Sequence, residues 1–179
     1  MNDIHSYLPR NRRLAEQLVG CRLQSIVRWL DAPADVEDDL RFEYGPAELV
    51  SGNGKRWLVD VEESKANLLL FDLAEGVSGP WYSGFTLREP VVADSSSDPL
   101  RFLLQESIVS VDVISRDPEP GVPDSYAMCG LRLTTESGAQ LCVGTRLAEE
   151  LPIQEVAFRL PGEVDPALRY ELLREAGMS

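Results

Sequence analysis

The sequence has few of the residue types from which most enzyme active sites are built. It contains a single histidine, His5, among 179 residues, so nucleophile–histidine triads and histidine-based metal sites are not expected. Its three cysteines are odd in number, widely spaced and without a Cys-x-x-Cys pair, which predicts free buried thiols rather than disulfides or a metal centre. These cysteines are Cys21, Cys129 and Cys142. We therefore expect no cofactor and no metal.

Long apolar runs are also missing. Runs such as residues 68–71 (LLLF) are far shorter than the roughly 20 apolar residues that a membrane-spanning helix needs. The arginines at the N-terminus are followed by no apolar stretch that could form a signal peptide. The sequence therefore predicts a cytoplasmic protein that does not enter a membrane.

Nucleotide-binding and nucleophile motifs are absent as well. No Gly-x-Gly-x-x-Gly follows a predicted strand, and no glycine-rich loop ends in Gly-Lys-Ser/Thr. The nearest approach to a nucleophile elbow is Gly76-Val77-Ser78, but Pro80 stands where the motif needs its second glycine. Asp60 and Glu62 lie two residues apart on one face of a predicted strand, where they could act as a general acid/base pair or simply face water. The sequence favours a protein that is not an enzyme.

Basic residues are outnumbered by acidic ones. There are 17 lysines and arginines against 30 aspartates and glutamates, for a net charge of −13. Direct binding to nucleic acid is disfavoured, because neutralising phosphates requires clustered basic residues. A cationic partner is favoured, since a strongly negative protein attracts one over long distances. The acidity has a simpler interpretation too, as a surface charge that maintains solubility.

Secondary structure in the first half follows from alternating apolar residues and turn signals. A helix is predicted from Leu8-Pro9 onward, because proline is favoured at the first helical position. Gly52-Asn53-Gly54 separates two apolar runs and predicts a tight hairpin. The predicted strands cover residues 21–30, 40–44, 47–50, 56–62 and 66–73, with a short extended segment at 85–89.

The second half repeats this order after a polar linker at residues 93–98. Asp98-Pro99 predicts a helix start, and Glu136-Ser137-Gly138 predicts a second hairpin turn. The predicted strands cover residues 107–115, 126–135, 140–143 and 153–160. Asp165-Pro166 predicts the start of a C-terminal helix, which would carry Leu168, Leu172 and Leu173.

Local identities between the halves point to an internal repeat. Ser25-Ile26-Val27 recurs as Ser107-Ile108-Val109 at an offset of 82, and at an offset of 84 Gly54 matches Gly138 and Val59 matches Val143. We expect an α+β fold of two similar lobes, each a mainly antiparallel sheet with a packed helix, arising by internal duplication. The halves would be residues 1–92 and 99–179, joined by the linker at 93–98. A half of this size has a marginal core by itself, so the two should pack into one compact unit.

Two features are candidate partner-binding sites. The first is an acidic loop with four carboxylates at Asp35, Glu37, Asp38 and Asp39, which could steer a cationic partner. It has no calcium-loop spacing, and its alternative interpretation is a solvated charge run. The second is Trp81-Tyr82, in a loop rich in glycine and proline, where the rings could anchor a partner or fold back over the core.

In size, negative charge and expected α+β architecture, the whole chain resembles the immunity proteins with which bacteria neutralise their own polymorphic or contact-delivered toxins. That resemblance implies a small, cytoplasmic, non-catalytic protein that inhibits a basic toxin domain by binding it. An adaptor or regulatory protein of another pathway, and an enzyme that uses carboxylates only, are the alternative hypotheses.

Overall fold

The computed structural model describes residues 7–30, 45–74, 87–92, 98, 100–148 and 156–177. These residues form two antiparallel sheets of five strands each, with few helices. The first half contains α1 (Tyr7–Glu16), β1 (Leu23–Leu30), β2 (Ala47–Ser51), β3 (Arg56–Glu62), β4 (Asn67–Asp72) and β5 (Leu87–Pro90). The second contains α2 (Phe102–Gln105), β6 (Ile108–Ser115), β7 (Gly130–Thr135), β8 (Gln140–Gly144), β9 (Ala157–Arg159), the 3₁₀ turn η4 (Pro161–Glu163) and β10 (Arg169–Glu175).

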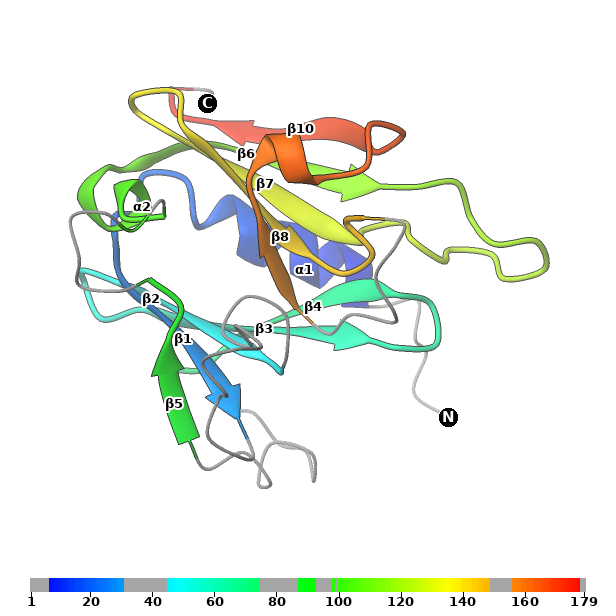
Figure 1. The fold of residues 1–179 in the computed structure, drawn as a ribbon, viewed down its shortest axis with the longest axis horizontal. Coiled ribbons are helices and arrows are strands. Elements are labelled where there is room, and N and C mark those ends of the chain that lie inside the picture. Colours follow the sequence, from blue (N-terminus) through cyan, green and yellow to red (C-terminus); the bar gives the residue numbers. More distant parts are fainter. Residues whose placement is uncertain are drawn as a thin grey trace.

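The two sheets have the same connectivity. Their strand orders are β4-β3-β2-β1-β5 and, in the matching direction, β9-β8-β7-β6-β10. In each half four strands form a meander, and the fifth returns to pair with the free side of the first. The sheets lie as two layers with α1 behind and between them (Figure 1).

Strand register matches residue by residue. Leu23 pairs with Ser51 as Ile108 pairs with Thr135, and each pairing is followed by a register shift in β1 or β6. Ile108 therefore corresponds to Leu23, at an offset of 85 residues. The Ser-Ile-Val match at an offset of 82 is thus out of register by three residues, and this part of the sequence comparison was wrong.

Both hairpins form at the predicted turns. Gly54 and Gly138 have φ of +85° and +84°, a conformation that glycine adopts without steric cost. Each turn is closed by a backbone hydrogen bond, from Ser51 N to Lys55 O (2.8 Å) and from Thr135 N to Ala139 O (2.9 Å). The predicted match of Gly54 with Gly138 is therefore in register.

The sheets also meet at equivalent positions. Arg22, the residue before β1, forms an antiparallel bridge with Ser107, the residue before β6. Arg22 O accepts from Gly52 N (3.0 Å), and Ser107 O accepts from Glu136 N (3.1 Å). At this bridge a residue of the first half therefore pairs, in antiparallel orientation, with its own counterpart by register in the second half.

One core cluster contains buried side chains from both sheets and from α1, among them Leu18, Trp57 and Leu141. Trp57 is fully buried, whereas Trp29 is half-buried and donates from Nε1 to Glu48 (3.1 Å). A smaller cluster, which includes Cys129 and Cys142, adjoins it in the second half.

The predicted C-terminal helix is wrong, because residues 169–175 form strand β10 instead. The spacing of the leucines also fits a strand with a bulge, and β10 pairs with β6, whose backbone groups need partners on that side. Leu168 is buried while Leu172 is 49% exposed, so the leucines do not share one apolar face. The helix predicted at Asp98-Pro99 is reduced to the single turn of α2.

Several predictions lie outside the described residues. They are His5, the strand at 40–44, the linker at 93–97, the acidic loop with Asp35, Glu37, Asp38 and Asp39, and the pair Trp81 and Tyr82. Among the helices that the structure describes, none has the length and apolar character needed to cross a bilayer.

Candidate functional site

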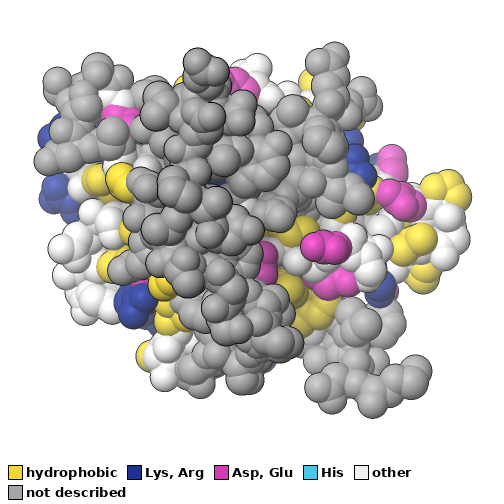
Figure 2. Space-filling view, turned by 60° about the horizontal axis from the view of Figure 1, so that its bottom comes forward, with side chains coloured by type: hydrophobic (Ala, Val, Ile, Leu, Met, Phe, Trp, Pro, Cys, Tyr) yellow, Lys and Arg dark blue, Asp and Glu magenta, His cyan; other side chains and the backbone are white. Residues whose placement is uncertain are grey.

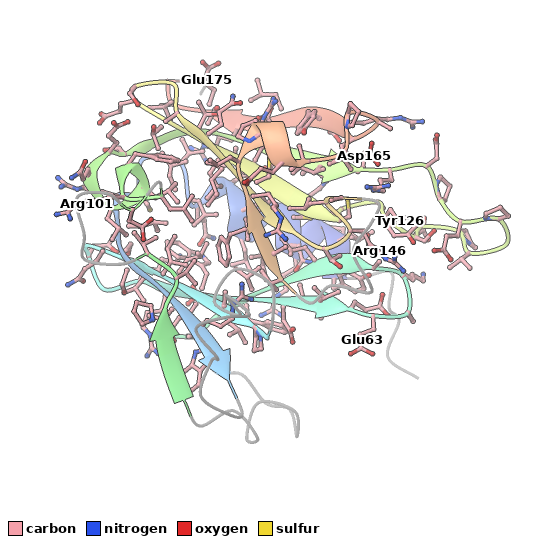
Figure 3. The ribbon with its side chains drawn as sticks, viewed as in Figure 1. Glu63, Arg101, Tyr126, Arg146, Asp165 and Glu175 are labelled. Carbon is pink, nitrogen blue, oxygen red and sulfur yellow. The ribbon has the colours of Figure 1, made fainter. Side chains whose placement is uncertain are left out.

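Two adjoining hollows lie at one end of the molecule, with volumes of about 310 and 230 Å³. Tyr126 and Arg146 line both, so we name them together the Tyr126–Arg146 cleft. The larger is also lined by Arg116, Asp117, Ala148, Asp165 and Ala167, and the smaller by Glu63, Ser64, Lys65, Ala66, Glu119 and Ser125. Figure 3 shows Tyr126, Arg146 and Asp165 together at this end.

Buried Asn67, at the start of β4, builds one wall by joining the first sheet to the loop between β6 and β7. Its Nδ2 donates to Asp124 O (2.8 Å), and its Oδ1 accepts from Met128 N (2.9 Å). Beside it, Tyr126 N donates to Lys65 O (2.9 Å). The cleft therefore lies where the two halves of the chain meet.

A close approach of β7 and β8 places Arg146 at the cleft. Gly130 and Gly144 pair across these strands, and a Cβ on Gly144 would collide with the carbonyl oxygen of Cys129. Thr145 N donates to Cys129 O (2.8 Å), so the chain is still held to β7 when β8 ends. Arg146 follows directly, with φ of +53°.

Backbone strain is concentrated here. Among the described residues, the non-glycine positions with positive φ are Ala66 (49°), Asp124 (65°), Tyr126 (55°) and Arg146 (53°). Three of them line the cleft, and the carbonyl of Asp124 accepts the hydrogen bond from Asn67 described above. Such conformations cost about 1–3 kcal/mol each and occur preferentially at functional sites.

Polar groups in the cleft are incompletely hydrogen-bonded. Asp165 Oδ2 lies 2.8 Å from Arg116 Nη2, and these side chains are only 7% and 20% exposed. The two groups form an ion pair, but they are not aligned for a hydrogen bond, and Arg116 Nε also lacks one. Arg146 Nε is buried without a hydrogen-bond partner among the described residues. Buried donors without partners are rare in folded proteins, because each costs free energy.

The Tyr126 hydroxyl donates to the Glu119 carboxylate. This hydrogen bond, followed by burial, raises the pKa of Tyr126, while the positive charges of Arg146 and Arg116 lower it. The hydroxyl therefore stays protonated at neutral pH and can act as a donor. Both guanidinium groups are close enough to act electrostatically on its oxygen.

Other candidate groups have structural roles or are unreactive. Glu62 accepts from Lys65 N (2.9 Å) and from the Ser64 hydroxyl, and so holds the turn between β3 and β4. Burial raises the pKa of Cys129 to about 12 and that of Cys142 to about 11, which leaves both thiols protonated. Within the described part of the chain, no group of three His, Cys, Asp or Glu side chains is placed to hold a metal ion.

Sequence reasoning missed this cleft. Its residues come from four segments, 63–66, 116–126, 146–148 and 165–167, and no spacing joins them in one motif. The loop at 116–124 could be recognised as acidic and rich in proline, but Tyr126 and Arg146 carry no sequence signal. No protein-family model, curated protein or solved structure matches the chain.

Proposed function

We propose that this is a non-catalytic binding protein of the immunity type, which inhibits a toxin by receiving part of it in the Tyr126–Arg146 cleft. One observation carries the proposal. Strained backbone and buried guanidinium nitrogen atoms without hydrogen-bond partners occur together at one cleft. A bound partner group would supply the missing hydrogen bonds and so offset a cost that the unbound protein bears.

The charge of the chain supports a basic protein partner. A net charge of −13 accelerates the approach of a cationic domain, an effect screened over a Debye length of about 8 Å at physiological salt. Figure 2 shows acidic side chains beside basic ones on the side toward which the 116–124 loop projects. We keep the acidic loop at 35–39 as a steering element, and Trp81 and Tyr82 as anchors, within this proposal. A cytoplasmic location, next to a toxin's target, is part of it.

We further propose that the two similar lobes arose by internal duplication. The common strand order, the equivalent bulges in β1 and β6, and the bridge between Arg22 and Ser107 support this origin. The cleft would then form beside a point where the second copy departs from the first, since β8 ends at Gly144 while its counterpart β3 continues to Glu62.

The proposal is tested with a purified partner. The tagged protein is used to isolate binding proteins from its native host, and a candidate toxin domain encoded beside its gene is then purified. We expect a stoichiometric complex that suppresses the toxin's activity, and we expect Arg146→Gly to weaken it while Arg174→Ala, on exposed β10, does not. A toxin domain that binds wild type and Arg146→Gly equally well excludes the cleft as the interface, and failure to inhibit any neighbouring toxin ends the immunity proposal.

A further inference from the structure

We propose that the Tyr126–Arg146 cleft binds a carboxylate group, held by the guanidinium group of Arg146 and the hydroxyl of Tyr126. In the complex this group would be an acidic side chain or the C-terminus of the protein partner. The identity of that partner rests on the proposed function, but the carboxylate site itself does not.

Among the described cations that line the cleft, Arg146 is the one without a counter-ion in the described part of the chain. Arg116 is paired with Asp165, and Asp117 is paired with Arg169. Among the residues that the structure describes, no carboxylate lies within ion-pair distance of Arg146, and its buried Nε has no hydrogen-bond partner. A guanidinium edge in this state matches a carboxylate, which accepts charge-assisted hydrogen bonds from it.

Tyr126 offers a second donor beside it. Its hydroxyl donates to Glu119, whose residue is exposed at the rim, so a carboxylate is already accommodated at this oxygen. Arg146 acts electrostatically on the same hydroxyl. An incoming carboxylate can therefore take the place of Glu119 as acceptor for the Tyr126 hydroxyl. It can also form an ion pair with Arg146, which Glu119 does not.

The lining favours a singly charged carboxylate over phosphate. Four acidic residues line the two hollows, namely Glu63, Asp117, Glu119 and Asp165. Their negative charge repels a dianion more than a monoanion. Ala66, Ala148 and Ala167 add apolar surface, against which the carbon stem of a carboxylate can pack. The larger hollow, of about 310 Å³, has room for one such group.

The test follows the Nε–H signals of the arginines by NMR while sodium acetate is added at constant ionic strength. Arg146→Lys removes one signal and thereby assigns it. We expect acetate to shift the Arg146 signal saturably, with a dissociation constant in the millimolar range, and inorganic phosphate to bind more weakly. Tyr126→Phe should weaken acetate binding severalfold.

Arg146→Gly is the main variant, because glycine suits the positive φ at this position and the fold should be retained. We expect it to weaken acetate binding at least about tenfold, which corresponds to loss of one charge-assisted hydrogen bond. Arg174→Ala is the matched control; Arg174 is exposed beside Glu175, which Figure 3 places at the opposite end of the molecule. Its acetate binding should equal that of wild type.

Three results would overturn the proposal: no saturable shift of Arg146, tighter binding of phosphate than of acetate, or acetate binding that survives in Arg146→Gly. These results are independent of the toxin experiment. A protein that binds acetate but inhibits no toxin keeps the carboxylate site and loses the proposed function. A protein that inhibits a toxin without acetate binding at Arg146 does the reverse.

Discussion

The two halves of the chain share one strand order but finish their sheets differently. In the first half, β4 is covered by α1, and β5 ends at Pro90, which cannot donate a backbone hydrogen bond. In the second half, β10 continues for seven residues and exposes Tyr170 (37%) and Leu172 (49%). Leu172 of β10 pairs with Asp112 of β6, and Pro90 of β5 pairs with Val27 of β1. Asp112 corresponds to Val27 by register, so exposed Leu172 stands where the first half has Pro90. Two sheets with the same topology can therefore protect the backbone groups of their edge strands in different ways.

The halves also fill the shared core with side chains of different size. Arg28 is fully buried over the ring of Phe158, 5.2 Å from its centroid, and its counterpart by register is Val113. Likewise Trp57 corresponds to Leu141. Equivalent strand positions in the two halves therefore hold side chains of very different volume. Equal topology thus does not require similar sequence.

The largest expected effect is a loss of folding stability, and it tests how much each half contributes to the shared core. Trp57→Ala should lower the free energy of unfolding by about 4 kcal/mol, because it leaves a large buried cavity. Leu141→Ala, at the corresponding position, should cost about 3 kcal/mol. Urea denaturation of both variants measures the difference. A smaller loss for Trp57→Ala than for Leu141→Ala would show that the second half dominates the core.

The cysteine pair makes the second half sensitive to alkaline pH. Burial raises the pKa of Cys129 to about 12, whereas the thiol ionises near pH 8.5 when unfolded. Between these values the unfolded state has lost the proton and the folded state has not, so stability falls as pH rises, by about 1.4 kcal/mol per pH unit. The corresponding position in the first half is Gly45, which has no titrating group.

Urea denaturation between pH 8 and 10.5 checks this sign. Cys129→Ala should reduce the loss of stability over that range by about 2 kcal/mol, since it removes the group whose ionisation is suppressed by folding. Cys21→Ala serves as the control, because Cys21 is only partly buried. An identical pH dependence in Cys129→Ala and wild type would contradict the assignment.

Protection of the β4 edge depends on one amide. Buried Asn11 donates from Nδ2 to Leu68 O (2.7 Å) and accepts at Oδ1 from Leu70 N (3.1 Å), in place of a neighbouring strand. Asn11→Ala should cost about 2 kcal/mol, because two buried backbone groups lose their partners. Hydrogen exchange at the Leu70 amide should accelerate more than at amides of β7. Arg13→Ala, on the exposed side of the same helix, should change neither.

The smallest expected effect concerns strain at the cleft. Arg146→Gly should stabilise the fold by about 1 kcal/mol, because glycine removes the cost of a positive φ. Ala66→Gly should stabilise by a similar amount through the same relief of strain while it keeps Arg146, which separates strain from recognition by the arginine. Thermal unfolding and the acetate titration measure both. Destabilisation by Arg146→Gly would mean that contacts of the arginine outweigh the strain.

Prediction from sequence succeeded where the signal was local. The strands around Gly54 and the strand after Gly138 were placed correctly, because a positive φ at a tight turn and the alternation beside it are properties of neighbouring residues. The strand before Gly138 was predicted from residue 126 but begins at Gly130. The C-terminal segment was misassigned as a helix, since its leucine spacing fits both periodicities and only the vacant side of β6 decides between them. The Ser-Ile-Val match failed because identity at a few positions does not define register.

The sequence by itself determined the charge, the scarcity of histidine and most of the strands, all of which follow from composition and short-range pattern. Tertiary structure alone decided the functional candidate. Arg116, Tyr126, Arg146 and Asp165 meet only because Asn67 joins the first sheet to the loop after β6 and because Gly130 and Gly144 let β7 and β8 approach closely. Contacts between residues so far apart depend on how the whole chain packs, which no local pattern records.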